Sequence, residues 1–182
     1  MASKPPPRIL IVAGSDSSGG AGIQADIKTV TMLGGYAMTA VTALTAQNTQ
    51  GVRDVAPSSP DFVRAQIAAC IEDIGVDAVK IGMLGGAAIA SAVAEEMDKL
   101  AVPIVFDPVM VATSGAALAD EGTIAAFARL MELATVTTPN LPELAALTGM
   151  SPGNSVAVAE AAQVLRDRHG CAVPAKGGHG AS

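Results

Sequence analysis

The chain has 182 residues, half of them hydrophobic, with 19 glycines and a formal net charge of −6 at pH 7. It contains one Tyr, three Phe and no Trp, so its core must be built from aliphatic side chains. The length fits one domain of ordinary size. The hydrophobicity excludes a disordered chain, and the acidic balance argues against a nucleic-acid partner, which needs a basic face.

Cysteine usage and the apolar stretches bear on the cellular compartment. Cys70 and Cys171 are the only two cysteines, too few for a disulfide framework, and we expect both to be buried free thiols in a reducing compartment. Gly, Pro or charged residues interrupt every apolar stretch before the roughly 18 residues that a membrane span needs. Residues 1–7 are proline-rich and predict a short disordered lead-in, not a signal peptide. We therefore expect a cytoplasmic protein with no membrane partner.

Short β-branched runs alternate with Ala- and Leu-rich helical runs along the chain. Strands are predicted over residues 8–13, 36–44, 78–81, 103–106, 134–138 and 171–175, the last weakened by Pro174. Helices are predicted over residues 23–33, 60–74, 86–100, 123–133, 141–147 and 156–169. Ser59 and Pro60 have the residue types of an N-cap and a first helical position. Residues 45–57 indicate an irregular segment or a short hairpin.

This alternation predicts an α/β fold with a mostly parallel sheet between helices. Such sheets bind ligands beyond the carboxyl ends of their strands. Polar and glycine residues gather at those positions, in residues 14–22, 47–48, 82–83, 107–110, 138–143 and 176–179. Because no repeat or linker is visible, we expect a single domain over residues 8–182.

The glycine-rich segment 14–22 does not match either common nucleotide-binding motif. Gly14 and Gly19 have the spacing of a P-loop, but Gly20 stands where that motif needs Lys. Gly20, Gly22 and Ala25 match a dinucleotide-binding pattern, yet the match begins several residues after the strand and lacks the later acidic residue. The segment is therefore either a ligand cradle of converging backbone N–H groups or a flexible connection.

Two further signals are ambiguous when each is taken alone. Asp26 is either a solvated acid in the first turn of a helix, favoured there by the helix dipole, or a residue of the binding site. Gln47 and Asn48 follow a strand. Their amides suit the edge of a heteroaromatic ring, and they equally suit a turn.

The later strand ends carry charged groups. Asp107 follows a buried strand, where its carboxylate could organise Mg²⁺ through water. Asn140 and Glu143 stand at a helix start, where they fit either a phosphate–metal site or a simple capping box. Lys176 precedes two glycines, which suits a phosphate contact or a charged flexible tail. Together these residues indicate phosphate chemistry at one edge of the sheet.

Six segments, in this order, resemble the hydroxymethylpyrimidine/phosphomethylpyrimidine kinases of thiamine biosynthesis, in the ribokinase-like superfamily. They are AGSDSSGGAGIQADIKT (13–29), TALTAQNTQGV (42–52), KIGML (80–84), FDPVM (106–110), TPNLPE (138–143) and KGGH (176–179). The resemblance covers about residues 8–179. It implies a ribokinase-like three-layer α/β/α sandwich, a transferase activity and the cofactors ATP and Mg²⁺. The reaction implied is transfer of the ATP γ-phosphoryl group to 4-amino-5-hydroxymethyl-2-methylpyrimidine, then to the monophosphate so formed.

The resemblance also implies roles for individual residues. The pyrimidine pocket corresponds to Gly14, Ala21, Asp26, Gln47, Met83 and Val109. Gln47 would read the ring nitrogen and the amino group. Asp107 and Glu143 correspond to the Mg²⁺ region, Asn140 and Lys176 contact the nucleotide phosphates, and Lys176 is the catalytic residue that approaches the transferred group.

The family pattern continues beyond the last residue of this sequence, Ser182. The family has there a Gly-Thr-Gly-Cys or Gly-Thr-Gly-Asp motif whose N–H groups form an anion hole. We therefore expect a C-terminally truncated domain with little or no activity on its own, since an anion hole contributes several kcal/mol to catalysis. We also expect self-association through an exposed sheet edge, giving a homo-oligomer.

Two alternatives remain open from the sequence. One is a non-catalytic remnant that binds the pyrimidine without turnover. The other is a relative of the pyridoxal or pyridoxamine kinases, against which Gln47 within AQNTQG favours the pyrimidine.

Overall fold

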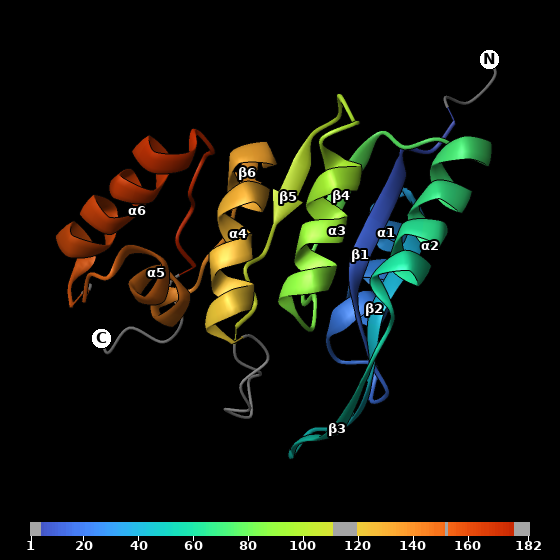
Figure 1. The fold of residues 1–182 in the computed structure, drawn as a ribbon, viewed down its shortest axis with the longest axis horizontal. Helices are drawn as coiled ribbons and strands as arrows, with labels where there is room; N and C mark the ends of the chain where they lie inside the picture. The colour runs from blue at the N-terminus through green and yellow to red at the C-terminus, as the bar shows by residue number, and fades with distance from the viewer. Residues whose placement is uncertain (1–4, 111–119, 152, 177–182) are drawn as a thin grey trace.

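A computed structural model describes residues 5–110, 120–151 and 153–176. Its six-stranded sheet has the order β3-β2-β1-β4-β5-β6, with every pairing parallel except that of β2 with β3 (Figure 1). The strands are β1 (Arg8–Asp16), β2 (Tyr36–Asn48), β3 (Gly51–Pro57), β4 (Ala78–Ile81), β5 (Ile104–Phe106) and β6 (Val136–Thr137). The helices are α1 (Gly22–Met32), α2 (Pro60–Asp73), α3 (Ala87–Met97), α4 (Glu121–Leu133), α5 (Leu141–Thr148) and α6 (Ser155–His169).

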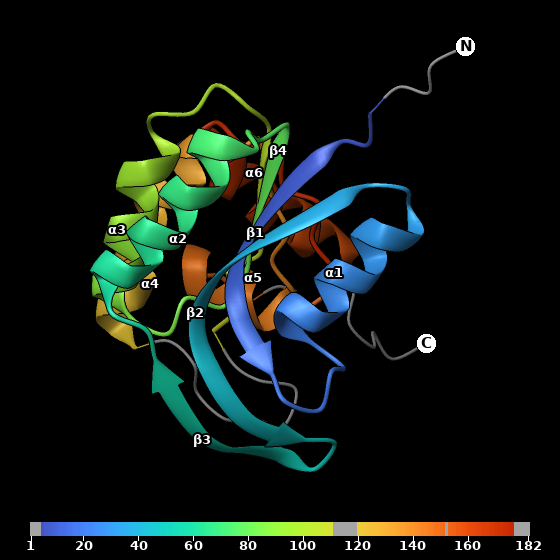
Figure 2. The same cartoon turned by 90° about the vertical axis from the view of Figure 1, so that its right-hand side faces the viewer.

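Helices cover both faces of the sheet, as predicted. Figure 2 shows α1 on one side and α2, α3 and α4 on the other, while α5 and α6 lie beyond β6 (Figure 1). Alternate residues of β1 enter different cores: Leu10 and Val12 join the larger cluster, whereas Ile11 and Ala13 pack with Ile23 of α1. A strand buried on both faces needs a continuous apolar run, which explains the composition of residues 9–13.

The first two strands are longer than predicted. The β1–β2 pairing continues past an irregularity between Ala13 and Ser15 and reaches Asp16 opposite Thr45. β2 then turns at residues 49–50 into β3. Residues 45–57 therefore form a hairpin, which confirms the second of the two predicted alternatives and not the irregular segment. The polar composition of this segment reflects exposure, because most of β3 is solvent-exposed.

The predicted last strand is not formed. Residues 171–175 make one isolated bridge, between Val136 and Ala172, and a second isolated bridge joins Asn140 to Lys176. Pro174 has no N–H to donate to a ladder, so continuous pairing is interrupted.

The helix termini follow the sequence signals. The Ser59 hydroxyl accepts a hydrogen bond from the Phe62 N–H, with Pro60 at the first helical position. Gly170 ends α6 in the left-handed conformation. In the described part of the chain, no helix is both long and apolar enough to cross a membrane.

The two cysteines differ from each other. Both are free, and Cys171 is buried as predicted, whereas Cys70 is only partly buried because it lies at the margin of the larger core. Of the predicted lead-in, residues 1–4 lie outside the described residues. The Pro7 carbonyl accepts a hydrogen bond from the Tyr36 N–H at 2.8 Å, so the sheet already holds this position.

Candidate functional site

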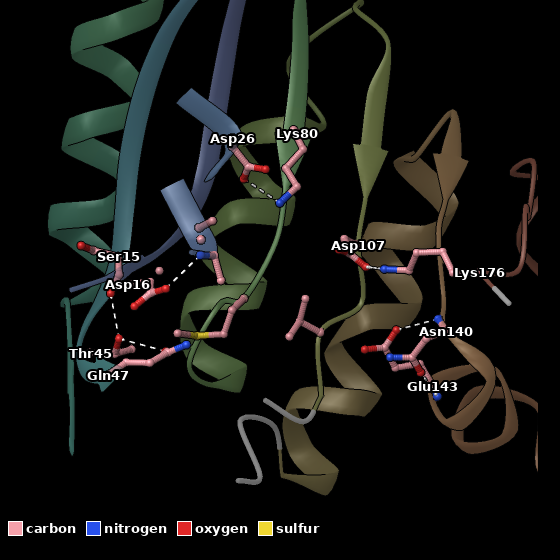
Figure 3. A pocket seen from close by; sticks show the side chains of 16 residues that line it. Ser15, Asp16, Asp26, Thr45, Gln47, Lys80, Asp107, Asn140, Glu143 and Lys176 are labelled. Carbon is pink, nitrogen blue, oxygen red and sulfur yellow. Dashed lines mark hydrogen bonds and ion pairs between the residues drawn. The ribbon is translucent and has the colours of Figure 1, made fainter. Parts of the chain in front are cut away.

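A cavity of about 340 Å³ opens at the carboxyl edge of the parallel strands (Figure 3). All ten candidate residues from the sequence line it: Gly14, Ala21, Asp26, Gln47, Met83, Asp107, Val109, Asn140, Glu143 and Lys176. The structure therefore brings together residues that are up to 162 positions apart in the segments 14–176. Gly177, Gly178 and His179 of the same sequence pattern lie outside the described residues.

Two glycines of segment 14–22 are closely packed, Gly14 against a flexible side-chain end and Gly22 against backbone. A Cβ on Gly14 would lie 2.4 Å from Cε of Met83, and a Cβ on Gly22 would lie 2.3 Å from the Gly14 carbonyl oxygen. Gly22 also has a φ of +56°, which favours glycine. The backbone of the loop thus forms part of the cavity wall, and the alternative of a merely flexible connection is wrong.

Asp16, which the sequence analysis did not single out, organises this loop. Its carboxylate accepts hydrogen bonds from the N–H groups of Ser18 (2.8 Å), Gly20 (3.0 Å) and Ala21 (2.9 Å), and from the Ser18 hydroxyl (2.8 Å). Burial alone would raise the pKa of Asp16, but these hydrogen bonds outweigh burial and hold the pKa below its ordinary value. The converging N–H groups therefore bind a carboxylate of the protein itself and are not free for a phosphate.

Asp26 is paired across the cavity wall. Its Oδ2 lies 2.7 Å from Nζ of Lys80, and the two side chains are only 23% and 27% exposed. Because α1 begins at Gly22, its first turn contains no acidic residue, so the interpretation of Asp26 as a solvated first-turn acid is wrong. The sequence analysis also missed Lys80, although a charged residue inside the apolar strand β4 was a signal that could have identified it.

Gln47 and Asn48 have different roles. The Asn48 carboxamide oxygen accepts from the N–H groups of Gln50 (2.9 Å) and Gly51 (3.2 Å) and so forms the hairpin turn. The Gln47 side chain lines the cavity. Its backbone is held by Ser17, whose hydroxyl donates to the Gln47 carbonyl (2.7 Å) and accepts from the Gln47 N–H (2.9 Å).

The far end of the cavity is charged. Nζ of Lys176 lies 2.6 Å from Oδ1 of Asp107, and Asn140 and Glu143 form a capping box at α5. Glu143 is buried, and its burial raises the pKa of the carboxyl group, against hydrogen bonds from backbone N–H groups that lower it. Figure 3 shows this group facing the Gln47 end from across the cavity.

The donor set of the charged end suits a magnesium–phosphate complex. Mg²⁺ is usually held by one or two carboxylates together with substrate phosphates and water, and Asp107 and Glu143 provide two carboxylates. No group of three or more His, Cys, Asp or Glu side chains that could hold a metal ion by itself occurs among the residues that the structure describes.

Comparison with known proteins links the fold and the cavity to one family. The family described as phosphomethylpyrimidine kinase matches residues 16–182. The hydroxymethylpyrimidine/phosphomethylpyrimidine kinase of Haemophilus influenzae is 44% identical over 94% of this chain, which spans 65% of that relative's length. A crystal structure of phosphomethylpyrimidine kinase from Clostridium difficile has a TM-score of 0.88 and 38% identity, covering 97% of this chain and 77% of its own.

A second group of solved structures is similar as well. Pyridoxal kinase from Staphylococcus aureus in complex with pyridoxal has a TM-score of 0.84 and 36% identity, covering 95% of this chain and 64% of its own. The same kinase has been solved in complex with ADP and with AMP-PCP.

Proposed function

The chain belongs to the phosphomethylpyrimidine kinase family, and from that membership we propose that it phosphorylates a pyrimidine in thiamine diphosphate biosynthesis. The γ-phosphoryl group of ATP would pass to the hydroxymethyl group of 4-amino-5-hydroxymethyl-2-methylpyrimidine. A second transfer would go to the monophosphate. Both transfers would take place in the cavity at the carboxyl edge of the parallel strands.

The observation that carries this proposal is the chemical difference between the two ends of the cavity. One end contains the Gln47 amide, the Asp16 carboxylate bound by its own loop, and the Asp26–Lys80 ion pair, and the other contains Asp107, Glu143 and Lys176 (Figure 3). A neutral heteroaromatic ring suits the first end, and a phosphate chain with its cation suits the second. Phosphoryl transfer depends mainly on such positioning and on neutralising charge.

At the Gln47 end, the side-chain amide would bind the ring nitrogen and the amino group of the pyrimidine. Gly14, Ala21, Met83 and Val109 would contact the faces of the ring. Asp26 completes this wall, and its charge is neutralised by Lys80 at 2.7 Å. This end of the cavity therefore suits an uncharged ligand.

At the charged end, Lys176 would contact phosphate oxygens together with Asn140, while Asp107 and Glu143 would hold Mg²⁺ through water. ATP and Mg²⁺ supply the transferable group and positive charge. The ammonium group of Lys176 can move between Asp107 and a phosphate, because its side chain is 46% exposed. In this way an acidic protein presents cations where the substrate is most negative.

Binding measurements on the 182-residue chain test the proposal. We expect calorimetry to detect the pyrimidine and AMP-PCP. Lys176→Met should weaken AMP-PCP binding more than tenfold and pyrimidine binding less than twofold, because a charge-assisted hydrogen bond contributes about 1.5–3 kcal/mol. Lys99→Met is the matched control, since Lys99 pairs with Glu96 away from the cavity. No binding of the pyrimidine at millimolar concentration would contradict the proposal, whereas binding of the pyrimidine without binding of AMP-PCP would favour a non-catalytic binding protein.

Pyridoxine phosphorylation is the second candidate, because pyridoxal kinase of Staphylococcus aureus shares the fold at 36% identity. Competition between pyridoxine and the pyrimidine for the same chain separates the two. We expect the pyrimidine to displace pyridoxine, since the Gln47 amide matches its adjacent ring nitrogen and amino group.

We also propose that the protein is a cytoplasmic homo-oligomer. Light scattering coupled to size exclusion measures the oligomeric state directly, and a monomer at all concentrations would contradict this.

A further inference from the structure

Thr45 is the one hydrogen-bond partner of the Gln47 side chain among residues 5–110, 120–151 and 153–176. The two residues are two positions apart on β2, on either side of a register irregularity between Ala46 and Gln47, and both side chains line the cavity. Thr45 is buried, with 8% of its surface exposed. Figure 3 shows the two side chains next to each other at the Gln47 end of the cavity.

The Thr45 hydroxyl has one proton and two acceptors within reach. Its Oγ1 lies 3.0 Å from the Ser15 carbonyl oxygen and 3.2 Å from Oε1 of Gln47. The Ser15 contact fixes the hydroxyl against β1, because Asp16 pairs with Thr45 across the two strands. Since both of these oxygens only accept, the single hydroxyl proton is shared between them in a three-centre hydrogen bond, which positions the hydroxyl before any ligand binds.

Because Oε1 of Gln47 faces Thr45, the Nε2 of the same amide faces the cavity. An amide nitrogen has two N–H donors and no acceptor. A ligand that contacts it directly must present a hydrogen-bond acceptor, such as an aromatic ring nitrogen. Ser17 holds the backbone of Gln47 through two hydrogen bonds that do not involve Thr45. Thr45 therefore affects the orientation of the Gln47 side-chain amide and not the position of the Gln47 backbone.

We propose that Thr45 is a specificity-determining positioning residue. Through its hydroxyl it orients the Gln47 amide so that the cavity selects a ring with an acceptor nitrogen next to the amino group. This inference rests on the proposed pyrimidine function and extends it. Thr45 acts through Gln47 and is not itself a catalytic residue.

Two ligands and three variants test this role. The ligands are 4-amino-5-hydroxymethyl-2-methylpyrimidine and its analogue with C–H in place of the ring nitrogen beside the amino group. We expect the unmodified chain to prefer the pyrimidine about tenfold, the effect of one net hydrogen bond. Thr45→Val, which keeps the shape and removes the hydroxyl, should reduce that preference to less than twofold, whereas Thr45→Ser should restore it.

If Thr45 had only a structural role, Thr45→Val would lower the affinity for both ligands by the same factor, and the ratio of the two affinities would stay at about tenfold. That result would overturn the inference. Gln47→Glu gives a second measurement that does not depend on the stability of Thr45→Val. Glu has no donor for the ring nitrogen, so pyrimidine affinity should fall more than tenfold. Retention of affinity within twofold would show that an acceptor faces the cavity and would overturn the inference. An unmodified chain that binds neither ligand would instead refute the proposed function.

Discussion

At the scale of single residues, the site depends on charged groups that are satisfied inside the protein. Asp16 is 4% exposed, and backbone N–H groups of its own loop compensate its carboxylate. Asp26 is compensated by Lys80 from another strand. The charges of Asp26 and Lys80 cancel, whereas the Asp16 carboxylate keeps its negative charge, which the N–H groups of its loop stabilise.

The lowered pKa of Asp16 predicts how stability depends on pH. Since its pKa is depressed in the folded state below the reference value of 3.8, its carboxylate stabilises the fold fully above about pH 3.8, and that contribution is lost as the pH falls through the folded pKa. Asp16→Asn should remove it and lower the free energy of unfolding by about 1–3 kcal/mol at pH 7.

Urea unfolding of both proteins between pH 3 and pH 7 measures this. Asp54→Asn is the control, because the Asp54 carboxylate accepts a hydrogen bond only from the adjacent Val55 N–H on the exposed strand β3, as far as the described residues show. Equal stability of Asp16→Asn and the unmodified chain at pH 7 would contradict the prediction.

At the scale of elements, local capping and the functional site coincide at the start of α5. Asn140 accepts from the Glu143 N–H at 2.9 Å, and Glu143 accepts from the Asn140 N–H at 2.9 Å. The sequence left capping and phosphate binding as alternatives for these residues. The structure shows the capping box at the cavity wall. The same positions of Asn140 and Glu143 are therefore compatible with helix capping and with phosphate binding.

A comparison of two N-caps separates these contributions. Asn140 caps α5 at the cavity, and Asn154 caps α6 away from it, accepting from the Ala157 N–H at 3.0 Å. Each change to Ala should lower the free energy of unfolding by about 1 kcal/mol. Only Asn140→Ala should also weaken AMP-PCP binding, by about fivefold or more, as measured by calorimetry. Equal nucleotide affinity in the two variants would show that Asn140 is only a cap.

At the scale of the whole molecule, the cavity depends on close contact between the end of β1 and the segment after β4, which are far apart in sequence and adjacent in the sheet. Gly14 follows the centre of β1, and Met83 follows β4, the strand that pairs with β1. No side chain at position 14 fits without movement of Met83, because a Cβ there would lie 2.4 Å from its Cε.

Gly14→Ala should therefore displace Met83 and reduce pyrimidine affinity about tenfold, with a loss of stability of about 1 kcal/mol, the low end for overpacking, because the atom in the way is the flexible end of the Met83 side chain. Gly153→Ala is the control, since no atom of residues 5–110, 120–151 and 153–176 lies within 4 Å of its added Cβ. Calorimetry and urea unfolding measure the two effects. Combining Gly14→Ala with Met83→Ala should recover part of the stability, and a Gly14→Ala protein that binds as tightly as the unmodified chain would contradict the packing argument.

The sequence by itself determined the alternation of strands and helices from β4 to α6, the mostly parallel sheet and the edge at which the site lies. These properties depend on local periodicity, on caps such as Ser59 and Gly170, and on the rule that parallel strands present their carboxyl ends together. Only the tertiary structure decided how the site residues are paired. Lys80 reaches Asp26 across 54 positions, and the Asp16 carboxylate occupies the N–H groups that a phosphate would otherwise use. Such contacts depend on distances between separate elements, which local sequence patterns do not specify.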